Sequence, residues 1–256
     1  MGRKVILILV DGMRADAVEQ CGHKFVEKIK KRGSFTVKAK TVIPPVTLPC
    51  HMSLFHSVDP ERHGILTNVY VPQVRPVKGL FEVLNDNGKS CAFCYNWEEL
   101  RDLGRPGSLD FSYFYNEMVH SDADEEVERQ AADYVRKHSP DFCFIYLGLT
   151  DEIGHRYGWM TEEYFAAMRR AWDCIEKVSK EFENDYTIFV TADHGGHDRT
   201  HGEDIIEDMT IPLFIYGDGI DAGKEIPDAR IIDIAPTIVS LMDLPADKQW
   251  EGRNLI

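Results

Sequence analysis

The stretch Lys4-Val-Ile-Leu-Ile-Leu-Val-Asp-Gly12 decides the fold of this 256-residue chain. Its apolar residues run without alternation from Val5 to Val10, which is the pattern of a strand buried on both faces. A strand of that kind belongs to a parallel sheet that helices cover on both sides. The run ends in Asp11, so a carboxylate lies directly after the strand. In parallel sheets, binding sites form outside the carboxyl ends of the strands.

The remainder of the chain alternates between strand-like and helix-like patterns. Short apolar runs predict strands at residues 4–10, 34–40, 90–95, 141–147, 186–191 and 211–216. Apolar residues at helical spacing predict helices at residues 14–31, 48–57, 77–87, 122–137, 161–183 and 233–242. This alternation implies an α/β fold with a mainly parallel central sheet and helices on both faces. We expect one domain over residues 1–256, with a surface lobe at 96–121 that shapes a pocket.

The composition excludes some classes of partner. The chain has 43 acidic and 29 basic residues, a formal net charge of −14, so we expect no nucleic-acid polymer as a partner. The apolar run at the N-terminus is too short for a secretion signal, and no segment approaches the roughly 20 apolar residues of a membrane span. We therefore expect a cytoplasmic protein with no membrane contact. The sequence leaves the oligomeric state open.

The cysteines agree with a reducing compartment. All six are scattered without the regular spacing of a disulfide framework. Cys91 and Cys94 form a C-x-x-C pair, but no second pair follows, and the segment around them has a strand pattern. We interpret these two residues as buried thiols, in preference to a redox or zinc-binding motif.

Side chains of the metal-ligand type follow the first predicted strand and the strand at 186–191. Asp11 comes directly after the first, while Asp193 and His194 follow the second, with His201 a short loop beyond. Carboxylates and imidazoles are ligands of zinc-type divalent cations. A histidine-rich loop can also be an ordinary solvated turn, so this segment alone does not decide between the two interpretations.

A third predicted strand contributes the same kinds of side chain. Asp151 and His155 follow the strand at 141–147, and their spacing is about one helical turn, so both can face one ion. Each has an ordinary alternative role, as a helix cap or as a solvated imidazole. Because three strand ends supply ligand-type residues to the same edge of the sheet, the combination predicts a metal site there.

Thr47 is the candidate nucleophile. It lies just before the predicted helix at 48–57, with Pro49 in the opening turn. A threonine at that place has a plain role as the N-cap residue. The helix N-terminus also offers free N–H groups that favour a bound anion, and a nearby metal ion can activate the hydroxyl. The two roles are compatible, and position alone does not separate them.

The motifs in this order resemble the alkaline phosphatase superfamily, and most closely its nucleotide pyrophosphatase/phosphodiesterase branch. They are Asp11, Thr47-Leu-Pro49, Glu61-Arg-His-Gly-Ile65 with Asn68, Asp151-x-x-x-His155, Asp193-His194-Gly195 and His201. The resemblance covers nearly all of the catalytic core, and it implies an alkaline-phosphatase-like fold.

The resemblance also implies a site with two divalent metal ions, usually zinc, with manganese as the alternative. One ion would be bound by Asp151, His155 and His201. The other would be bound by Asp11, Asp193, His194 and the Thr47 oxygen. Asn68, together with the Thr47 backbone N–H, would hold a non-bridging phosphoryl oxygen.

The expected activity is metal-dependent hydrolysis of a small phosphate ester. Thr47 would attack phosphorus in line and form a phosphoryl-threonine intermediate, which water then releases. Asn68 is a neutral donor and better matches a monoanionic diester, such as a nucleotide pyrophosphate. A monoesterase must neutralise a dianionic phosphoryl group, and an arginine beside the nucleophile would do that well. Arg62 and Arg75 are nearby in sequence, but we interpret them as solvated surface charges.

Other functions stay open at this point. The same site could serve a phosphomonoesterase, a phosphonate hydrolase or a phosphomutase, and a metal-stabilised binding protein is the non-enzymatic alternative. Sulfatase relatives need a Pro-Arg signature that the segment around Cys50 lacks. Only six residues separate His194 from His201, where the larger diesterases carry a long insertion, so nucleotide specificity does not follow from the resemblance.

Overall fold

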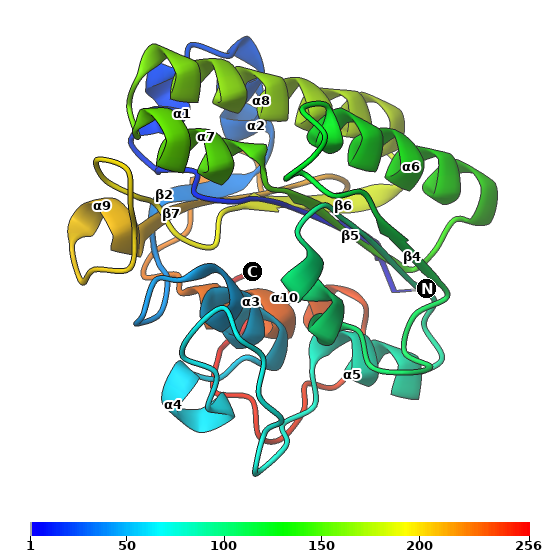
Figure 1. Cartoon of the computed structure of the whole chain (residues 1–256). Coiled ribbons are helices and arrows are strands. Elements are labelled where there is room, and N and C mark those ends of the chain that lie inside the picture. The colour runs from blue at the N-terminus through cyan, green and yellow to red at the C-terminus, as the bar shows by residue number, and fades with distance from the viewer. Residues whose placement is uncertain (1) are drawn as a thin grey trace.

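The computed structural model describes residues 2–256 and contains one eight-stranded sheet (Figure 1). Its strands are β1 (Lys4–Val10), β2 (Ser34–Lys40), β3 (Cys91–Tyr95), β4 (Phe111–Phe114), β5 (Phe142–Leu147), β6 (Tyr186–Thr191), β7 (Thr210–Tyr216) and β8 (Lys224–Glu225). They lie in the order β4-β3-β5-β1-β6-β7-β2-β8. Only β7 runs antiparallel to its two neighbours, β6 and β2. The expected mainly parallel sheet is therefore confirmed, with β7 as the antiparallel exception.

Helices cover both faces of this sheet (Figure 1). On one face lie α1 (Ala17–Gln20), α2 (Lys24–Arg32), α6 (Ala123–His138), α7 (Leu149–Tyr157) and α8 (Glu162–Phe182). On the other face lie α3 (Thr47–His56), α4 (Pro60–His63), α5 (Leu80–Asp86) and α10 (Ile234–Leu241). The short α9 (Ile206–Met209) lies beside the sheet, and two 3-10 turns span Glu98–Leu103 and Ile231–Asp233. The expected α/β layers are confirmed.

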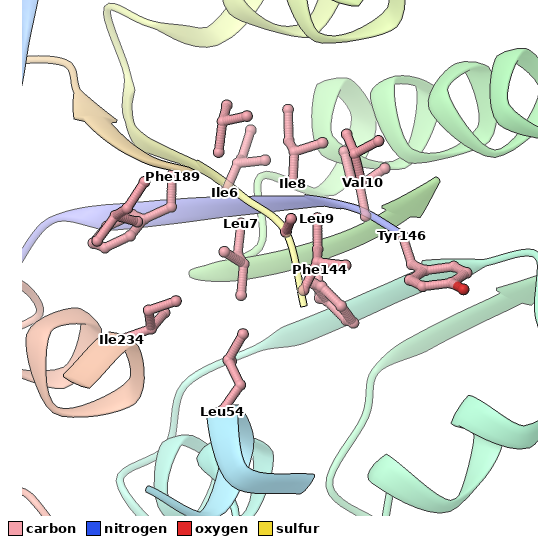
Figure 2. Close-up of a cluster of buried hydrophobic side chains, with 14 of the residues drawn as sticks. Ile6, Leu7, Ile8, Leu9, Val10, Leu54, Phe144, Tyr146, Phe189 and Ile234 are labelled. Atoms are coloured by element: carbon pink, nitrogen blue, oxygen red, sulfur yellow. The ribbon is translucent and has the colours of Figure 1, made fainter. Parts of the chain in front are cut away.

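The first strand is the centre of the core. Every side chain from Val5 to Val10 is completely buried, as the unbroken apolar run predicts. Figure 2 shows that Ile6 and Ile8 point toward one helical layer, while Leu7 and Leu9 point toward the other. Burying a side chain of this size stabilises a fold by roughly 1.5–3 kcal/mol. The strand that carries Asp11 is therefore held rigidly.

One local prediction is wrong in detail, and one possible role of Thr47 is excluded. The single helix expected at 14–31 is divided into α1 and α2, because Gly22 adopts a left-handed φ of 73°. His23 is then the N-cap of the second helix, and its ring accepts a hydrogen bond from the Phe25 N–H. Thr47 is not the N-cap of α3: Val46 occupies that position, and Thr47 is the first helical residue. The Thr47 hydroxyl is therefore not used as a cap.

The segment 96–121 combines irregular backbone with an edge strand. Its residues Phe111–Phe114 form β4, which pairs in parallel with β3. Cys91 and Cys94 lie in β3, and all six cysteines are free and buried, which confirms them as interior thiols. Within residues 2–256, none of the helices has both the length and the apolar character required to span a bilayer.

Candidate metal and phosphoryl-transfer site

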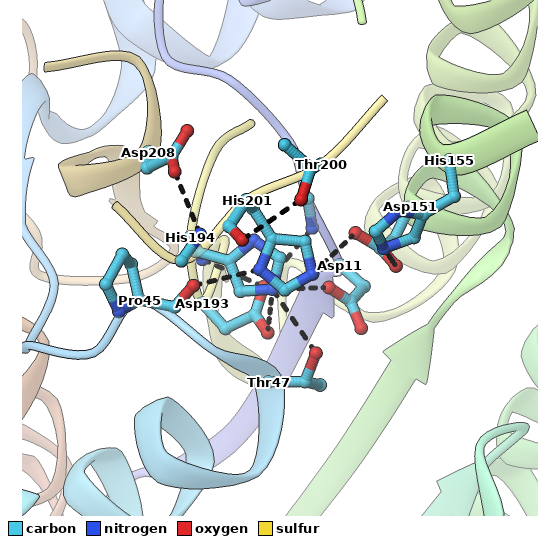
Figure 3. Close-up of polar contacts among 12 residues, drawn as sticks. Asp11, Pro45, Thr47, Asp151, His155, Asp193, His194, Thr200, His201 and Asp208 are labelled. Carbon is cyan, nitrogen blue, oxygen red and sulfur yellow. Dashed lines mark hydrogen bonds and ion pairs between the residues drawn. The ribbon is translucent and has the colours of Figure 1, made fainter. Parts of the chain in front are cut away.

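Three adjacent strands deliver the carboxylates of the site. β1 lies between β5 and β6 and pairs in parallel with both, so the carboxyl ends of all three strands meet at one edge. Asp11 follows β1 directly, Asp193 lies two residues after β6, and Asp151 is in the first turn of α7 after β5. We call Asp11, Asp151, His155, Asp193, His194 and His201 the edge cluster (Figure 3).

The first half of the edge cluster surrounds the ring of His194. Its Nε2 lies 3.3 Å from Asp11 Oδ1 and 3.4 Å from Asp193 Oδ2. The hydroxyl oxygen of Thr47 lies 3.2 Å from the same nitrogen. All four side chains are buried. One ligand atom from each of Asp11, Asp193 and His194 lies within 4.8 Å of the others, a spacing that one metal ion can bridge.

The second half of the edge cluster is built around Asp151. His155 is one turn further along α7, and its Nε2 lies 3.3 Å from Asp151 Oδ2. His201 Nε2 lies 3.8 Å from Asp151 Oδ1, and the His201 ring stacks on His194 at 3.8 Å between centroids. Asp151, His194 and His201 form a second compact group of possible ligands, so His194 lies between the two halves.

All three histidines of the edge cluster present the same nitrogen to the carboxylates. Their Nδ1 atoms donate to backbone carbonyl oxygens: His194 to Gly195 at 2.7 Å, His155 to Arg199 at 3.0 Å, and His201 to Pro45 at 2.9 Å. A carbonyl oxygen can only accept, so Nδ1 carries a proton, and Nε2 is the nitrogen whose lone pair can bind a metal ion once the ring is neutral. Histidine ligands of metal ions are commonly oriented in this way.

Three carboxylate oxygens of the edge cluster are buried without a donor. Within the described residues, no hydrogen-bond partner reaches Asp11 Oδ1, Asp151 Oδ1 or Asp193 Oδ2. Buried carboxylate oxygens without partners are strongly unfavourable unless a cation compensates them. Together with the three Nε2 lone pairs, they form a donor set that fits a divalent cation.

The pKa values report the same excess of negative charge. Burial raises the pKa of Asp11 well above its ordinary range, and repulsion from Asp193 and Asp151 raises it further. Burial, with repulsion from Asp151, raises the pKa of Asp193 to about 8. The hydrogen bond with Asp151 raises the pKa of His155 to about 9. A bound cation would remove the penalty on both carboxylates and would replace the proton on His155.

Close packing around Asp11 requires glycine at two positions. Gly12 has a φ of 63°, and a Cβ there would lie 2.8 Å from Asp151 Oδ1. A Cβ on Gly148 would lie 1.7 Å from Glu117 Oε2. The main chain just after β1 and β5 can therefore approach Asp151 and Glu117 only because both residues lack side chains.

The candidate nucleophile and its proposed partner lie together at the start of α3. Asn68 Oδ1 accepts a hydrogen bond from the Leu48 N–H at 3.0 Å, which ties the 64–77 loop to the helix N-terminus. The Thr47 N–H has no acceptor in the described chain, and it lies on the positive end of a ten-residue helix. This arrangement can hold an anionic oxygen beside the Thr47 hydroxyl.

Tyr146 and Glu117 belong to the site but did not emerge from the sequence. The Tyr146 hydroxyl donates to Asp11 Oδ2, and its position in an apolar strand was the only available signal. Glu117 is 9% exposed, and its Oε2 has no partner within residues 2–256. Burial, then repulsion from Asp11, raises the pKa of Glu117 well above its usual range. No local pattern marks Glu117, because only the chain path brings it to this edge.

Two arginines and three histidines are not members of the edge cluster, although His51 Nδ1 lies 3.6 Å from Asp193 Oδ2. The Arg62 guanidinium donates to the Arg75 carbonyl oxygen and to Gln249. Burial lowers the pKa values of three histidines with structural contacts, to about 3 for His51 and His56 and about 4 for His63. Arg62 is therefore bonded within the loop region, and these histidines are neutral at physiological pH.

Comparison with known families gives two successive matches along the chain. Residues 5–88 match the type I phosphodiesterase/nucleotide pyrophosphatase family. Residues 113–246, just over half of the chain, match the metalloenzyme superfamily. The first match contains Asp11, Thr47 and Asn68, and the second contains the remaining members of the edge cluster.

Individual relatives include both mutases and diesterases. A 2,3-bisphosphoglycerate-independent phosphoglycerate mutase of Bacteroides thetaiotaomicron is 30% identical over 137 residues, which cover 51% of this chain and 26% of the mutase. Human ectonucleotide pyrophosphatase/phosphodiesterase family member 1 is 27% identical over 183 residues, which cover 64% of this chain and 20% of that protein. The chain thus spans about a quarter or less of the length of these relatives.

Solved structures share the fold at low sequence identity. Murine ectonucleotide pyrophosphatase/phosphodiesterase 5 superimposes with a TM-score of 0.80 at 14% identity, covering 96% of both chains. A 2-O GAG sulfatase superimposes with a TM-score of 0.76, covering all of this chain and 73% of the sulfatase. The family matches, which imply divalent metal ions, agree with the donor set of the edge cluster. The chain therefore belongs to the metalloenzyme superfamily that includes the alkaline phosphatases, and it resembles the type I phosphodiesterase/nucleotide pyrophosphatase branch.

Proposed function

We propose that this protein hydrolyses small phosphodiesters, through a phosphoryl-threonine intermediate on Thr47. The observation that carries the proposal is the position of the Thr47 hydroxyl, 3.2 Å from His194 Nε2 at the N-terminus of α3. One ion would be held by Asp11, Asp193, His194 and Thr47, and a second by Asp151, His155 and His201. Zinc fits the mixed oxygen and nitrogen donors, and manganese is the alternative. Such ions lower the pKa of a bound hydroxyl and stabilise a departing oxygen.

The residues of the chain would act as follows. The Thr47 oxygen attacks phosphorus in line, and its bond to phosphorus forms as the bond to the leaving alcohol breaks. The Thr47 N–H and the Asn68 side-chain amide hold a non-bridging oxygen while charge develops on it. Water then attacks the phosphoryl-threonine, which returns the hydroxyl of Thr47 and releases phosphate monoester. Tyr146 keeps Asp11 oriented through its hydrogen bond to Oδ2.

The neutral donor at Asn68 favours diesters over monoesters. A diester carries one negative charge at phosphorus, whereas a monoester dianion is best neutralised by an arginine fork. Arg62 is already bonded to Gln249 and to the Arg75 carbonyl oxygen. The murine neighbour, whose inactive form carries a threonine-to-alanine change and binds AMP, supports both Thr47 as nucleophile and a nucleotide-like substrate.

A mutase or monoesterase is the second candidate. The observation that favours it is the 30% identity to the phosphoglycerate mutase of Bacteroides thetaiotaomicron. All of these activities use the same phosphoryl-threonine chemistry. A monoesterase differs from a diesterase in the charge of its substrate, and a mutase differs in the group that accepts the phosphoryl. A phosphonate hydrolase would use the same residues. The substrate panel below separates these activities.

The test is a panel of aryl esters with the purified protein and added zinc or manganese. We expect bis-p-nitrophenyl phosphate to be cleaved faster than p-nitrophenyl phosphate, an aryl phosphonate or an aryl sulfate. Faster cleavage of the monoester would instead identify a monoesterase or mutase site. Binding of metal without turnover of any ester would support a binding protein.

A matched pair of variants tests the nucleophile. Thr47→Ala should bind metal at its remaining ligands but lose turnover by at least about 10³-fold, the scale on which removal of a nucleophile acts. Thr47→Ser keeps a hydroxyl at the same place and should retain measurable turnover. If the alanine variant keeps full activity, water attacks phosphorus directly and the covalent route is wrong.

A further inference from the structure

The loop at residues 195–203 contacts all three histidines of the edge cluster. Its Gly195 carbonyl oxygen accepts the hydrogen bond from His194 Nδ1, and its Arg199 carbonyl oxygen accepts the one from His155 Nδ1. His201 is itself part of this loop. A displacement of the loop would therefore rotate every imidazole that faces the carboxylates. The residues that hold this loop in place therefore determine the geometry of the edge cluster.

Asp208, in α9, makes the contacts that hold this loop. Its side chain is completely buried, and Oδ2 accepts hydrogen bonds from the N–H groups of Gly202 and Glu203, each at 2.9 Å. Its Oδ1 accepts a third bond from His197 Nδ1 at 2.8 Å. These contacts lie on both sides of His201 along the chain. Figure 3 shows Asp208 beside the loop that leads to His201.

The backbone of α9 holds the other end of the loop. The Asp208 carbonyl oxygen accepts a hydrogen bond from the Gly195 N–H at 2.9 Å. The carbonyl oxygen of Glu207 accepts another from the Gly196 N–H at 3.1 Å. A Cβ on Gly195 would lie 1.9 Å from the Glu207 oxygen, so the two segments are in close contact. The loop is therefore tied to α9 near its start and near its end.

A buried carboxylate is unfavourable unless donors surround it, and hydrogen bonds to an ionised acceptor are the stronger kind. All three side-chain contacts of Asp208 are with the 195–203 loop. We propose that Asp208 is a positioning residue: it fixes the 195–203 loop, and through it the Nε2 atoms of His155, His194 and His201, in the arrangement that binds metal. This inference rests on the metal site of the proposed function, and nothing in it requires Asp208 to touch substrate.

The variant Asp208→Asn tests this role. It keeps the size of the side chain but turns an N–H₂ group toward the Gly202 and Glu203 N–H groups, or toward His197. We expect the metal-free variant to bind zinc about 10- to 100-fold more weakly, the range found when the partners behind metal ligands are removed. The measurement is competition for zinc with a chromophoric chelator, at constant pH and without substrate.

Asp204→Asn is the matched control. Asp204 is exposed, lies on the same segment and loses the same charge on substitution, but its side chain makes no hydrogen bond or ion pair within residues 2–256. Its zinc affinity should equal that of the wild type. A second readout is amide hydrogen exchange at Gly202 and Glu203, which should quicken in Asp208→Asn and stay unchanged in Asp204→Asn. A purely structural role would lower stability without weakening zinc binding.

A milder variant keeps the test valid if Asp208→Asn does not fold. His197→Gln removes one of the three contacts and should weaken zinc binding by less than Asp208→Asn, about tenfold at most. Unchanged zinc affinity and unchanged exchange in a folded Asp208→Asn would overturn the positioning role. If the wild-type protein itself binds no zinc or manganese, the proposed function fails instead, which is a different result.

Discussion

Two groups of histidines in this protein both donate a hydrogen bond from Nδ1 and differ in what surrounds Nε2. In α3, the Nδ1 atoms of His51 and His56 donate to backbone carbonyl oxygens four residues earlier, at 2.8 and 2.9 Å. In the edge cluster, the Nδ1 atoms of His155 and His201 also donate to backbone carbonyl oxygens. The Nε2 atoms differ: those of the edge cluster face Asp151, whereas His51 Nε2 is buried without a partner in the described chain.

The comparison shows that the surroundings of Nε2 determine whether a histidine in this protein can act as a metal ligand. A bond to the carbonyl four residues earlier needs only a helix, so it is available at any helical position. In the edge cluster, by contrast, the Nε2 atoms lie close to carboxylates only because the ends of several strands and a loop come together in the fold. Burial lowers the pKa of the α3 histidines and that of His201, to about 4, while a carboxylate partner raises that of the more exposed His155. The same residue type is thus structural in one place and a candidate ligand in the other.

The largest expected difference is between His194→Asn and His56→Asn. His194 Nε2 faces Asp11, Asp193 and Thr47, so its loss should reduce turnover by at least about 10²-fold and weaken zinc binding. His56→Asn should leave zinc affinity unchanged and lower the free energy of unfolding by about 1–3 kcal/mol, because a buried hydrogen bond is lost. Steady-state kinetics, zinc titration and urea unfolding measure these effects. Equal zinc affinity in both variants would contradict the ligand role of His194.

The next largest expected effect is a difference in zinc affinity between Gly12→Ala and Gly64→Ala. Both have a left-handed φ, 63° and 79°, so alanine introduces a similar backbone strain of about 1–2 kcal/mol. Only at Gly12 would the new Cβ contact Asp151, whereas nothing lies within 4 Å at Gly64. Gly12→Ala should therefore weaken zinc binding by about tenfold, and Gly64→Ala should not change it. Zinc titration of both variants decides whether the edge cluster needs this close approach.

The pH dependence of metal binding should follow His155. Its pKa is raised to about 9 in the metal-free protein, so near pH 7 the ring is protonated and a metal ion must displace the proton. Affinity at this position should rise with pH, by up to about tenfold per pH unit, and level off above pH 9. His155→Gln should remove this dependence. Titration calorimetry in buffers of different ionisation enthalpy would detect the released proton; its absence would contradict the prediction.

The smallest effect is expected on the stability of the metal-free protein. The pKa values of Asp11 and Asp193 are raised in the fold, to about 8 for Asp193, above their values in the unfolded chain. Their contribution to stability is therefore present below about pH 4 and is lost as the pH rises toward 8. The melting temperature without metal should fall over this range by a few degrees, and added zinc should abolish the fall. An unchanged profile on adding zinc would contradict cation binding at these carboxylates.

Much of the fold followed from local patterns, while three features did not. The unbroken apolar run of β1 and the alternation of strands and helices predicted the covered sheet, because both depend on short-range periodicity. The strand order and the reversed direction of β7 depend on pairing between distant segments, which a single sequence does not display. The break between α1 and α2 was visible only as Gly22, whose left-handed φ the structure supplies.

The candidate site likewise contains some residues that the sequence predicts and others that it does not. Asp11, Asp193 and His194 follow strands so closely that their place at the carboxyl edge could be read from the chain. Tyr146 could have been suspected as a polar group in an apolar strand, but Glu117 could not. Its carboxylate reaches the site because the segment after β4 passes over Gly148. Contacts of that kind depend on the three-dimensional path of the chain.

The sequence by itself determined which chemical groups are available: carboxylates and imidazoles at three strand ends, and a threonine at the start of a helix. Residue type and short-range spacing are written in the chain, and both persist in the folded protein. Only the tertiary structure decided that β5, β1 and β6 are neighbours and that Asp208 holds the loop around His201. The physical reason is that strand pairing and buried hydrogen bonds join residues far apart in sequence, and their geometry exists only once the core has packed.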